Sequence, residues 1–163
     1  MCGIIGISSN KSVSANIINS LKKLEYRGYD SAGIATLSDG YINEVKSEGR
    51  VENLEKNFDL KVLSGNIGIG HVRWATHGVP NSVNAHPHSS DNVSVVHNGI
   101  IENSTLLKKH LINQGHKFKS QTDTEVIVHL ITENLKSFEL QEAITKTLKQ
   151  LHGSFALGVI FKD

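Results

Sequence analysis

Apolar residues in this chain recur with two different periods, and the period predicts the type of each element. Short runs rich in isoleucine, valine and glycine are typical of buried strands, whereas apolar residues three or four positions apart are typical of helices. The runs predict strands at residues 3–8, 34–37, 41–45, 67–74, 93–96 and 154–161. Asp39-Gly40, a pair that favours a hairpin turn, joins the second strand to the third.

Five stretches have helical spacing. They lie near residues 12–24, 51–58, 104–114, 122–131 and 140–152. The second is short and of mixed charge, so we expect it to be exposed. Thr122 and Glu125 have the spacing of a capping box at the start of the fourth. The pattern as a whole indicates a fold that mixes helices and strands.

Composition indicates one globular domain. Hydrophobic residues make up 38% of the chain and charged residues 20%, a composition too apolar for a disordered protein. A length of 163 residues is too short for two domains of ordinary size. A formal net charge of +1 leaves no basic field for nucleic acid or a membrane surface. No apolar run approaches the roughly 20 residues that span a bilayer. The start also lacks a secretion signal, so we expect a cytoplasmic location.

Cys2 is the only cysteine, and it becomes the first residue if Met1 is removed. A thiol has a pKa of about 8.5 and an α-amino group one of about 7.7 to 8.0, so the free amine can accept the thiol proton near neutral pH. This pair matches an amino-terminal nucleophile, in which the base and the attacking atom share one residue. The alternative is an inert thiol behind a retained Met1.

Three further polar sites suit an attack on a carbonyl group. Asn98-Gly99, expected at the end of a strand, could donate an amide NH2 and a glycine N–H to an oxyanion, although Asn-Gly is most often only a turn. Arg73, also at a strand end, suits bidentate binding of a carboxylate or an ordinary ion pair. Asp123 falls in the first turn of a predicted helix, where it could cap the helix or receive an ammonium group.

Histidines in and beside residues 76–92 raise the question of a metal site. That stretch is the longest without either period, and loops of such length are usually functional or disordered. The histidines are His71, His77, His86, His88 and His97. No second cysteine, helical histidine pair or grouped carboxylate accompanies them, and no glycine-rich phosphate-binding motif is present. We therefore expect no metal and no cofactor.

Several short blocks of this sequence resemble a known family. Residues 2–6, CGIIG, are similar to the start of the class II glutamine amidotransferases. Further blocks resemble the branch that passes ammonia to fructose 6-phosphate. These blocks are LEYRGYDSAG (24–33), HVRWATHG (71–78), NAHPH (84–88), VVHNGIIEN (95–103) and TDTEV (122–126). They occur in order over essentially the whole chain, which makes the resemblance specific.

The resemblance implies an α+β fold, the four-layer αββα sandwich of the amino-terminal nucleophile hydrolases, here without its last strands. It also implies hydrolysis of L-glutamine to glutamate and ammonia. The implied roles are nucleophile for Cys2, oxyanion hole for Asn98 and Gly99, α-carboxylate binding for Arg73, α-ammonium binding for Asp123, glutamine loop and pocket wall for Trp74, Thr76, His77 and His86, and support near the nucleophile for Arg27 and Gly28.

By the same resemblance, residues 1–163 are a carboxyl-terminally truncated glutaminase domain. Family members continue into a sugar-phosphate isomerase portion, which binds fructose 6-phosphate, receives the ammonia and forms glucosamine 6-phosphate. The full-length enzyme is expected to be a homodimer. Three alternatives stay open: an amidotransferase that feeds ammonia to phosphoribosyl pyrophosphate, a noncatalytic histidine-rich metal-binding module, and a defective remnant with incomplete sheets.

Overall fold

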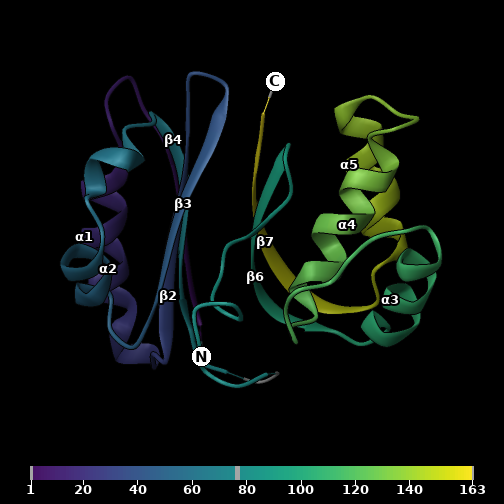
Figure 1. Ribbon diagram of the computed structural model, residues 1–163, viewed down its shortest axis with the longest axis horizontal. Coiled ribbons are helices and arrows are strands. Elements are labelled where there is room, and N and C mark those ends of the chain that lie inside the picture. Colours follow the sequence, from purple (N-terminus) through teal and green to yellow (C-terminus); the bar gives the residue numbers. More distant parts are fainter. Residues whose placement is uncertain (1, 76–77, 163) are drawn as a thin grey trace.

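Two antiparallel sheets lie face to face between two layers of helices (Figure 1). The computed structural model describes residues 2–75 and 78–162. The strands are β1 (Gly3–Ser8), β2 (Ser31–Ser38), β3 (Tyr41–Glu48), β4 (Ile67–Arg73), β5 (His88–Ser89), β6 (Val93–Ile101) and β7 (Gly153–Phe161). Their order is β1-β4-β2-β3 in the first sheet and β5-β6-β7 in the second. The predicted α+β sandwich is confirmed.

Helices cover the outer face of each sheet (Figure 1). The helices are α1 (Ser14–Leu24), α2 (Glu52–Asn57), α3 (Ser104–Asn113), α4 (Thr124–Asn134) and α5 (Leu140–Gln150), with 3-10 turns at Glu25–Arg27 and Leu60–Leu63. The first two helices lie on the first sheet and the other three on the second. Within the described residues, no helix combines the length and the apolar character needed to cross a bilayer.

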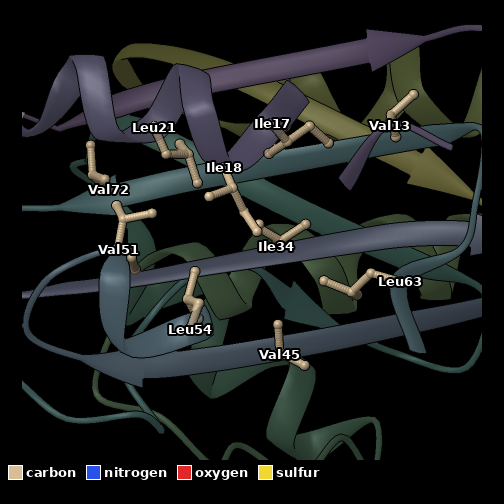
Figure 2. Close-up of a cluster of buried hydrophobic side chains, with 11 residues drawn as sticks. Val13, Ile17, Ile18, Leu21, Ile34, Val45, Val51, Leu54, Leu63 and Val72 are labelled. Carbon is tan, nitrogen blue, oxygen red and sulfur yellow. The ribbon is translucent and has the colours of Figure 1, made fainter. Parts of the chain in front are cut away.

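The core under α1 follows directly from the helical spacing in the sequence. Ile17 and Leu21 lie one turn apart on the same face, are fully buried and pack over the first sheet (Figure 2). Helix α1 can lie this close to β4 because Gly70 has no side chain. A Cβ at that position would lie only 2.5 Å from Ile17 Cγ2. The glycines of β4 therefore let α1 approach the sheet backbone.

The expectation that residues 51–58 form an exposed helix is only half right. A helix does form, but Leu54 and the preceding Val51 are fully buried in the same core as α1 (Figure 2). The helix has six residues, so a single inward position is enough to anchor it. Most residues of this helix are charged or polar, so its composition alone did not reveal the buried leucine.

The second sheet differs from the prediction at both of its long strands. Strand β6 does not stop at Val96 but continues through Asn98-Gly99 to Ile101, paired with β7 along its length. Strand β7, predicted to be buried, keeps only Ile160 fully inside. The reason is that β6 is its one partner among the described strands. Where the sheets meet, Ile69 and Val96 belong to one small apolar cluster.

Helix α3 distinguishes between leucines that the sequence pattern treats alike. Leu111 is fully buried against the second core, whereas Leu106, in the same helix, is 69% exposed.

We expect Leu111→Ala to lower the free energy of unfolding by about 2 to 5 kcal/mol, because it deletes buried apolar surface and leaves a cavity. Leu106→Ala is the matched control and should change it by less than about 0.5 kcal/mol. Urea unfolding measures both, and equal losses would contradict the described packing.

Candidate active site

One cavity collects most of the residues that the sequence singled out. Its volume is about 690 Å³, and its walls come from the residue before β1, the end of β4, the second half of β6, the start of α4 and the start of β7. The singled-out residues that line it are Cys2, Arg27, Arg73, Trp74, His86, Asn98, Gly99 and Asp123. Thr76 and His77, also expected here, lie outside the described residues.

Cys2 lies beside the end of β4 because β1 pairs with that strand. The pairing sets Gly3 opposite Val72, so the residue before β1 falls next to the residues that follow β4. The Trp74 backbone N–H donates to Cys2 Sγ over 3.2 Å, and the thiol reaches the Trp74 carbonyl at 3.5 Å. The sulfur is therefore held at the cavity wall and is not packed into the core.

Asn98 and Gly99 do not form a turn, which corrects the commonest interpretation of Asn-Gly. Both lie within β6, opposite Ala156 and Phe155 of β7. Asn98 Nδ2 donates to the Cys2 carbonyl over 3.3 Å. Gly99 has φ +128°, and a Cβ there would lie 2.2 Å from the Ser154 carbonyl oxygen. Only glycine fits this left-handed backbone so close to a neighbouring strand.

Arg73 ends β4 with its side chain almost fully buried. Its Nη1 lies 3.6 Å from Asp30 Oδ1, and its Nη2 donates to the Gly78 carbonyl over 3.4 Å. Asp30 also accepts the Ala75 backbone N–H and the Ser31 hydroxyl. Asp30 thus links the segment before β2 to the segment after β4. Sequence reasoning did not assign Asp30 a role, although it lies in a polar stretch directly before a strand.

Asp123 is the N-cap of α4 and does not lie in its first turn as predicted, so the cap is one residue later than the predicted Thr122. The Asp123 side chain makes no capping hydrogen bond. Its Oδ2 instead accepts the Ile101 backbone N–H over 2.8 Å. The predicted capping box is wrong. Glu125 accepts the backbone N–H groups of Lys119 and Ser120, upstream of the helix. The carboxylate of Asp123 is therefore tied to β6 at the cavity wall.

Trp74 lines the cavity and also contacts Gly28, in the segment between α1 and β2. Gly28 is the one described residue of the predicted site that does not line the cavity, and it lies directly against the Trp74 ring. A Cβ at Gly28 would lie 2.0 Å from Trp74 Cε3, and the residue has φ +118°. The indole itself is 54% exposed. The glycine is therefore needed so that the tryptophan can lie flat over this backbone.

A layer of buried histidines adjoins the cavity, and two of its members, His86 and His97, line it. His71 and His86 have ring centroids 4.3 Å apart, and His86 and His88 have centroids 5.0 Å apart. His86 Nδ1 accepts the His97 backbone N–H, while His86 Nε2 and His97 Nδ1 both contact Thr124 Oγ1, at 3.0 and 2.9 Å. These contacts connect the loop before β5 to β6 and α4.

Burial keeps the rings of His71, His86 and His88 neutral. It lowers the pKa of His71 and of His88 to about 3, and it lowers that of His86 well below the ordinary value. Within residues 2–75 and 78–162, no three or more histidine, cysteine, aspartate or glutamate side chains are grouped as metal ligands would be. The hydrogen bonds of these histidines are with threonine, asparagine and backbone groups, and His97 Nδ1 also lies 3.9 Å from Asp123 Oδ1.

Comparisons with known proteins bear on this arrangement. A profile of a family described as glutamine amidotransferase domain matches residues 71–163. Curated relatives named glutamine–fructose-6-phosphate aminotransferase (isomerizing) include one from Mesorhizobium japonicum, 53% identical over 99% of this chain. Another, from Pyrococcus horikoshii, is 53% identical over the whole chain. The chain spans only 27% and 28% of their respective lengths.

Solved structures share the fold. The glutamine phosphoribosylpyrophosphate amidotransferase of B. subtilis, complexed with ADP and GMP, superposes with a TM-score of 0.86 at 32% identity. The match covers 99% of this chain and 35% of that one. A glutamine aminotransferase class-II domain protein from Silicibacter pomeroyi matches with a TM-score of 0.65 at 12% identity, over 98% of this chain and 72% of that one. The second likeness is informative for the fold alone.

The neutral histidine layer predicts a loss of stability in acid. Between pH 6.5, the ordinary histidine pKa, and about pH 3, the unfolded chain binds protons that buried His71 and His88 do not. Unfolding therefore takes up protons, and the free energy of unfolding falls as pH is lowered through this window. Each such histidine contributes up to about 1.4 kcal/mol per pH unit.

Urea unfolding at a series of pH values from about 7.5 to 5 measures this dependence. His88→Gln should make the dependence shallower, because it removes one of the buried groups. His152→Gln, at an exposed position, is the control and should leave the slope unchanged. A free energy of unfolding that stays constant down to pH 5 would show that the buried rings do not titrate as described.

Proposed function

Because the chain belongs to the glutamine amidotransferase domain family, we propose that it hydrolyses the side-chain amide of L-glutamine to glutamate and ammonia, with Cys2 as the nucleophile. The observation that carries the proposal is convergence. Cys2, Arg73, Asn98 and Asp123 are far apart in the sequence, yet they line one cavity. The volume of that cavity, about 690 Å³, falls in the range of about 300 to 1,000 Å³ typical of small-molecule sites.

The first step requires removal of Met1, which frees the α-amine of Cys2. The amine takes the thiol proton as Sγ bonds to the amide carbon of glutamine, and the carbonyl electron pair moves onto the oxygen. Collapse of this tetrahedral species expels ammonia, which receives the proton from the α-ammonium group. Water then adds to the γ-glutamyl thioester with the amine again as base, and glutamate leaves as the thiolate is restored.

The negative oxygen formed in both steps needs donors beside Cys2. Asn98 is suited to this because its Nδ2 already lies 3.3 Å from the Cys2 carbonyl oxygen. Gly99, on the same strand, follows directly with a backbone N–H and no side chain to block an approach. Preorganised donors of this kind lower the barrier because they need not reorient as charge develops.

Two charged groups suit the backbone end of the substrate. Arg73 offers a planar guanidinium that can bind an α-carboxylate in bidentate fashion. The ion pair with Asp30 helps to fix the orientation of this guanidinium. Asp123 offers a carboxylate for the α-ammonium group, and its hydrogen bond from Ile101 N–H holds it at the wall. Trp74 and His86 would complete the pocket wall.

We further propose that the ammonia is used to make glucosamine 6-phosphate from fructose 6-phosphate. The names of the curated relatives support this acceptor at 53% identity. Since the chain spans about a quarter of their length, residues 1–163 would serve as a glutaminase domain beside a partner domain that binds the sugar phosphate. The homodimer implied by the resemblance and the cytoplasmic location expected from the missing secretion signal remain predictions.

Two alternatives have less support. A phosphoribosyl pyrophosphate acceptor is favoured by the structural likeness to the B. subtilis enzyme, but at 32% identity against 53% for the sugar-phosphate relatives. A histidine-rich metal-binding module would need imidazoles available to an ion. Here His86 and His97 share Thr124, and His88 contacts Thr122.

Cys2→Ala tests the nucleophile. In the full-length protein we expect glutamine-dependent ammonia release to fall by a factor on the order of 10³ or more, because the proposed thioester forms on Cys2, the only cysteine of residues 1–163. A glutamine-mimicking electrophile should add one label to the wild type and none to the variant, as measured by mass spectrometry of the intact chain. Thermal melting serves as the control for folding. Ammonia release that survives the substitution would refute the mechanism.

The acceptor is tested by offering fructose 6-phosphate or phosphoribosyl pyrophosphate to the full-length protein with glutamine. We expect glucosamine 6-phosphate with the first and no phosphoribosylamine with the second, each measured by mass spectrometry. The reverse result would favour the alternative acceptor while leaving the glutaminase half of the proposal intact.

A further inference from the structure

An asparagine in an oxyanion hole works in only one of its two amide orientations. If the NH2 group faces the attacked carbonyl, it donates to the developing negative oxygen, whereas a rotated amide would present its own oxygen and repel it. The two orientations fill the same space, so something other than shape must select between them. In this protein the candidate is His71, a buried histidine that the proposed mechanism does not use.

His71 contacts Asn98 across the interface between the two sheets. His71 lies on β4 in the first sheet, and its Nε2 is 3.0 Å from Asn98 Oδ1 and 3.0 Å from the His97 carbonyl oxygen, both on β6 in the second sheet. Both partners are acceptors in this arrangement. The ring must therefore carry its hydrogen on Nε2.

The surroundings of the His71 ring favour the same position and the same protonation, with the hydrogen on Nε2. His71 is fully buried, it pairs with Ile4 and Gly33 on the two neighbouring strands, and its ring lies against His86. Its Nδ1 has no hydrogen-bond partner among the described residues. Burial lowers the pKa of His71 to about 3, so the ring is neutral at working pH and its single N–H points at Asn98 and His97.

A rotated Asn98 amide would turn its NH2 group toward this N–H. Two donors would then face each other in a buried site, and the hydrogen bond from Nδ2 to the Cys2 carbonyl, 3.3 Å in the present orientation, would also be lost. Such buried, unsatisfied donors are strongly disfavoured. The position of one histidine proton thus selects the amide orientation.

We propose that His71 is a positioning residue, which holds the Asn98 carbonyl oxygen so that the Asn98 NH2 group faces the carbonyl attacked by Cys2. The inference rests on the proposed glutaminase activity and adds to it a residue that does not touch the substrate. Because the contact joins β4 to β6, it also couples the orientation of the oxyanion donor to the way the two sheets meet.

The test uses His71→Asn and His71→Gln in the full-length protein. The amide nitrogen of glutamine can occupy the place of Nε2, so His71→Gln keeps the donor, whereas asparagine is too short to reach. We expect His71→Asn to lower kcat about 10- to 100-fold with KM for glutamine little changed. The bound is the loss on the order of 10² to 10³ expected for Asn98→Ala. His71→Gln should retain kcat within roughly fivefold.

A double-mutant cycle separates positioning from a general structural effect. In the Asn98→Ala background, His71→Asn should cause no further loss of kcat, because no amide is left to orient. His88→Asn is the matched control, since it changes a buried histidine of the same layer that contacts Thr122 and not Asn98. Any loss it causes should multiply with that of Asn98→Ala. A His71→Asn loss that also multiplies would overturn the inference.

A second measurement needs no variant. In an atomic-resolution crystal structure, the C–N bond of the Asn98 amide, about 1.33 Å, can be told from the C=O bond, about 1.23 Å. We expect the shorter bond to point at His71, and the opposite orientation would overturn the inference. If the wild type shows no glutaminase activity, the proposed function fails together with this role. If only the cycle or the bond lengths disagree, the proposed function stands and His71 loses its role.

Discussion

The candidate site depends above all on the antiparallel pairing of β1 with β4. The register that sets Gly3 opposite Val72 leaves Cys2 beside Trp74, whose backbone N–H reaches the sulfur. Arg73, the last residue of β4, is placed by the same ladder. One ladder of backbone hydrogen bonds therefore sets the backbone positions of both Cys2, which precedes β1, and Arg73, which ends β4.

The second constraint is the way the two sheets meet. Apolar residues such as Ile69 and Val96 fill part of the interface, but buried His71, His86 and His97 lie beside the cavity, and the last two line it. Burying polar rings is unfavourable unless hydrogen bonds compensate. Asn98, Thr124 and the backbone supply such bonds, although His71 Nδ1 has no partner among the described residues. Neutral imidazoles can orient neighbouring groups without placing a full charge next to a developing oxyanion.

Local patterns allowed most of the fold to be predicted, and the errors share one cause. The strand at residues 3–8 matches β1, and the helix bearing Ile17 and Leu21 matches α1 because its spacing reflects a single buried face. The buried Leu54, the continuation of β6 through Asn98 and the turning of Glu125 away from its helix were all missed. Each depends on a partner that is distant in the sequence or on a backbone segment that the local pattern does not reveal.

The sequence by itself determined which groups are present: one thiol at position 2, an arginine after an apolar run, an Asn-Gly pair and a set of histidines. Their chemistry and their resemblance to a family were enough to name the candidate residues. Only the tertiary structure decided that Cys2, Arg73, Asn98 and Asp123 share a cavity, that Asp30 lies behind Arg73, and that Asn98 meets His71 across two sheets. The sequence states which side chains are present, but the distances between those side chains depend on strand register and sheet packing, which no single segment encodes.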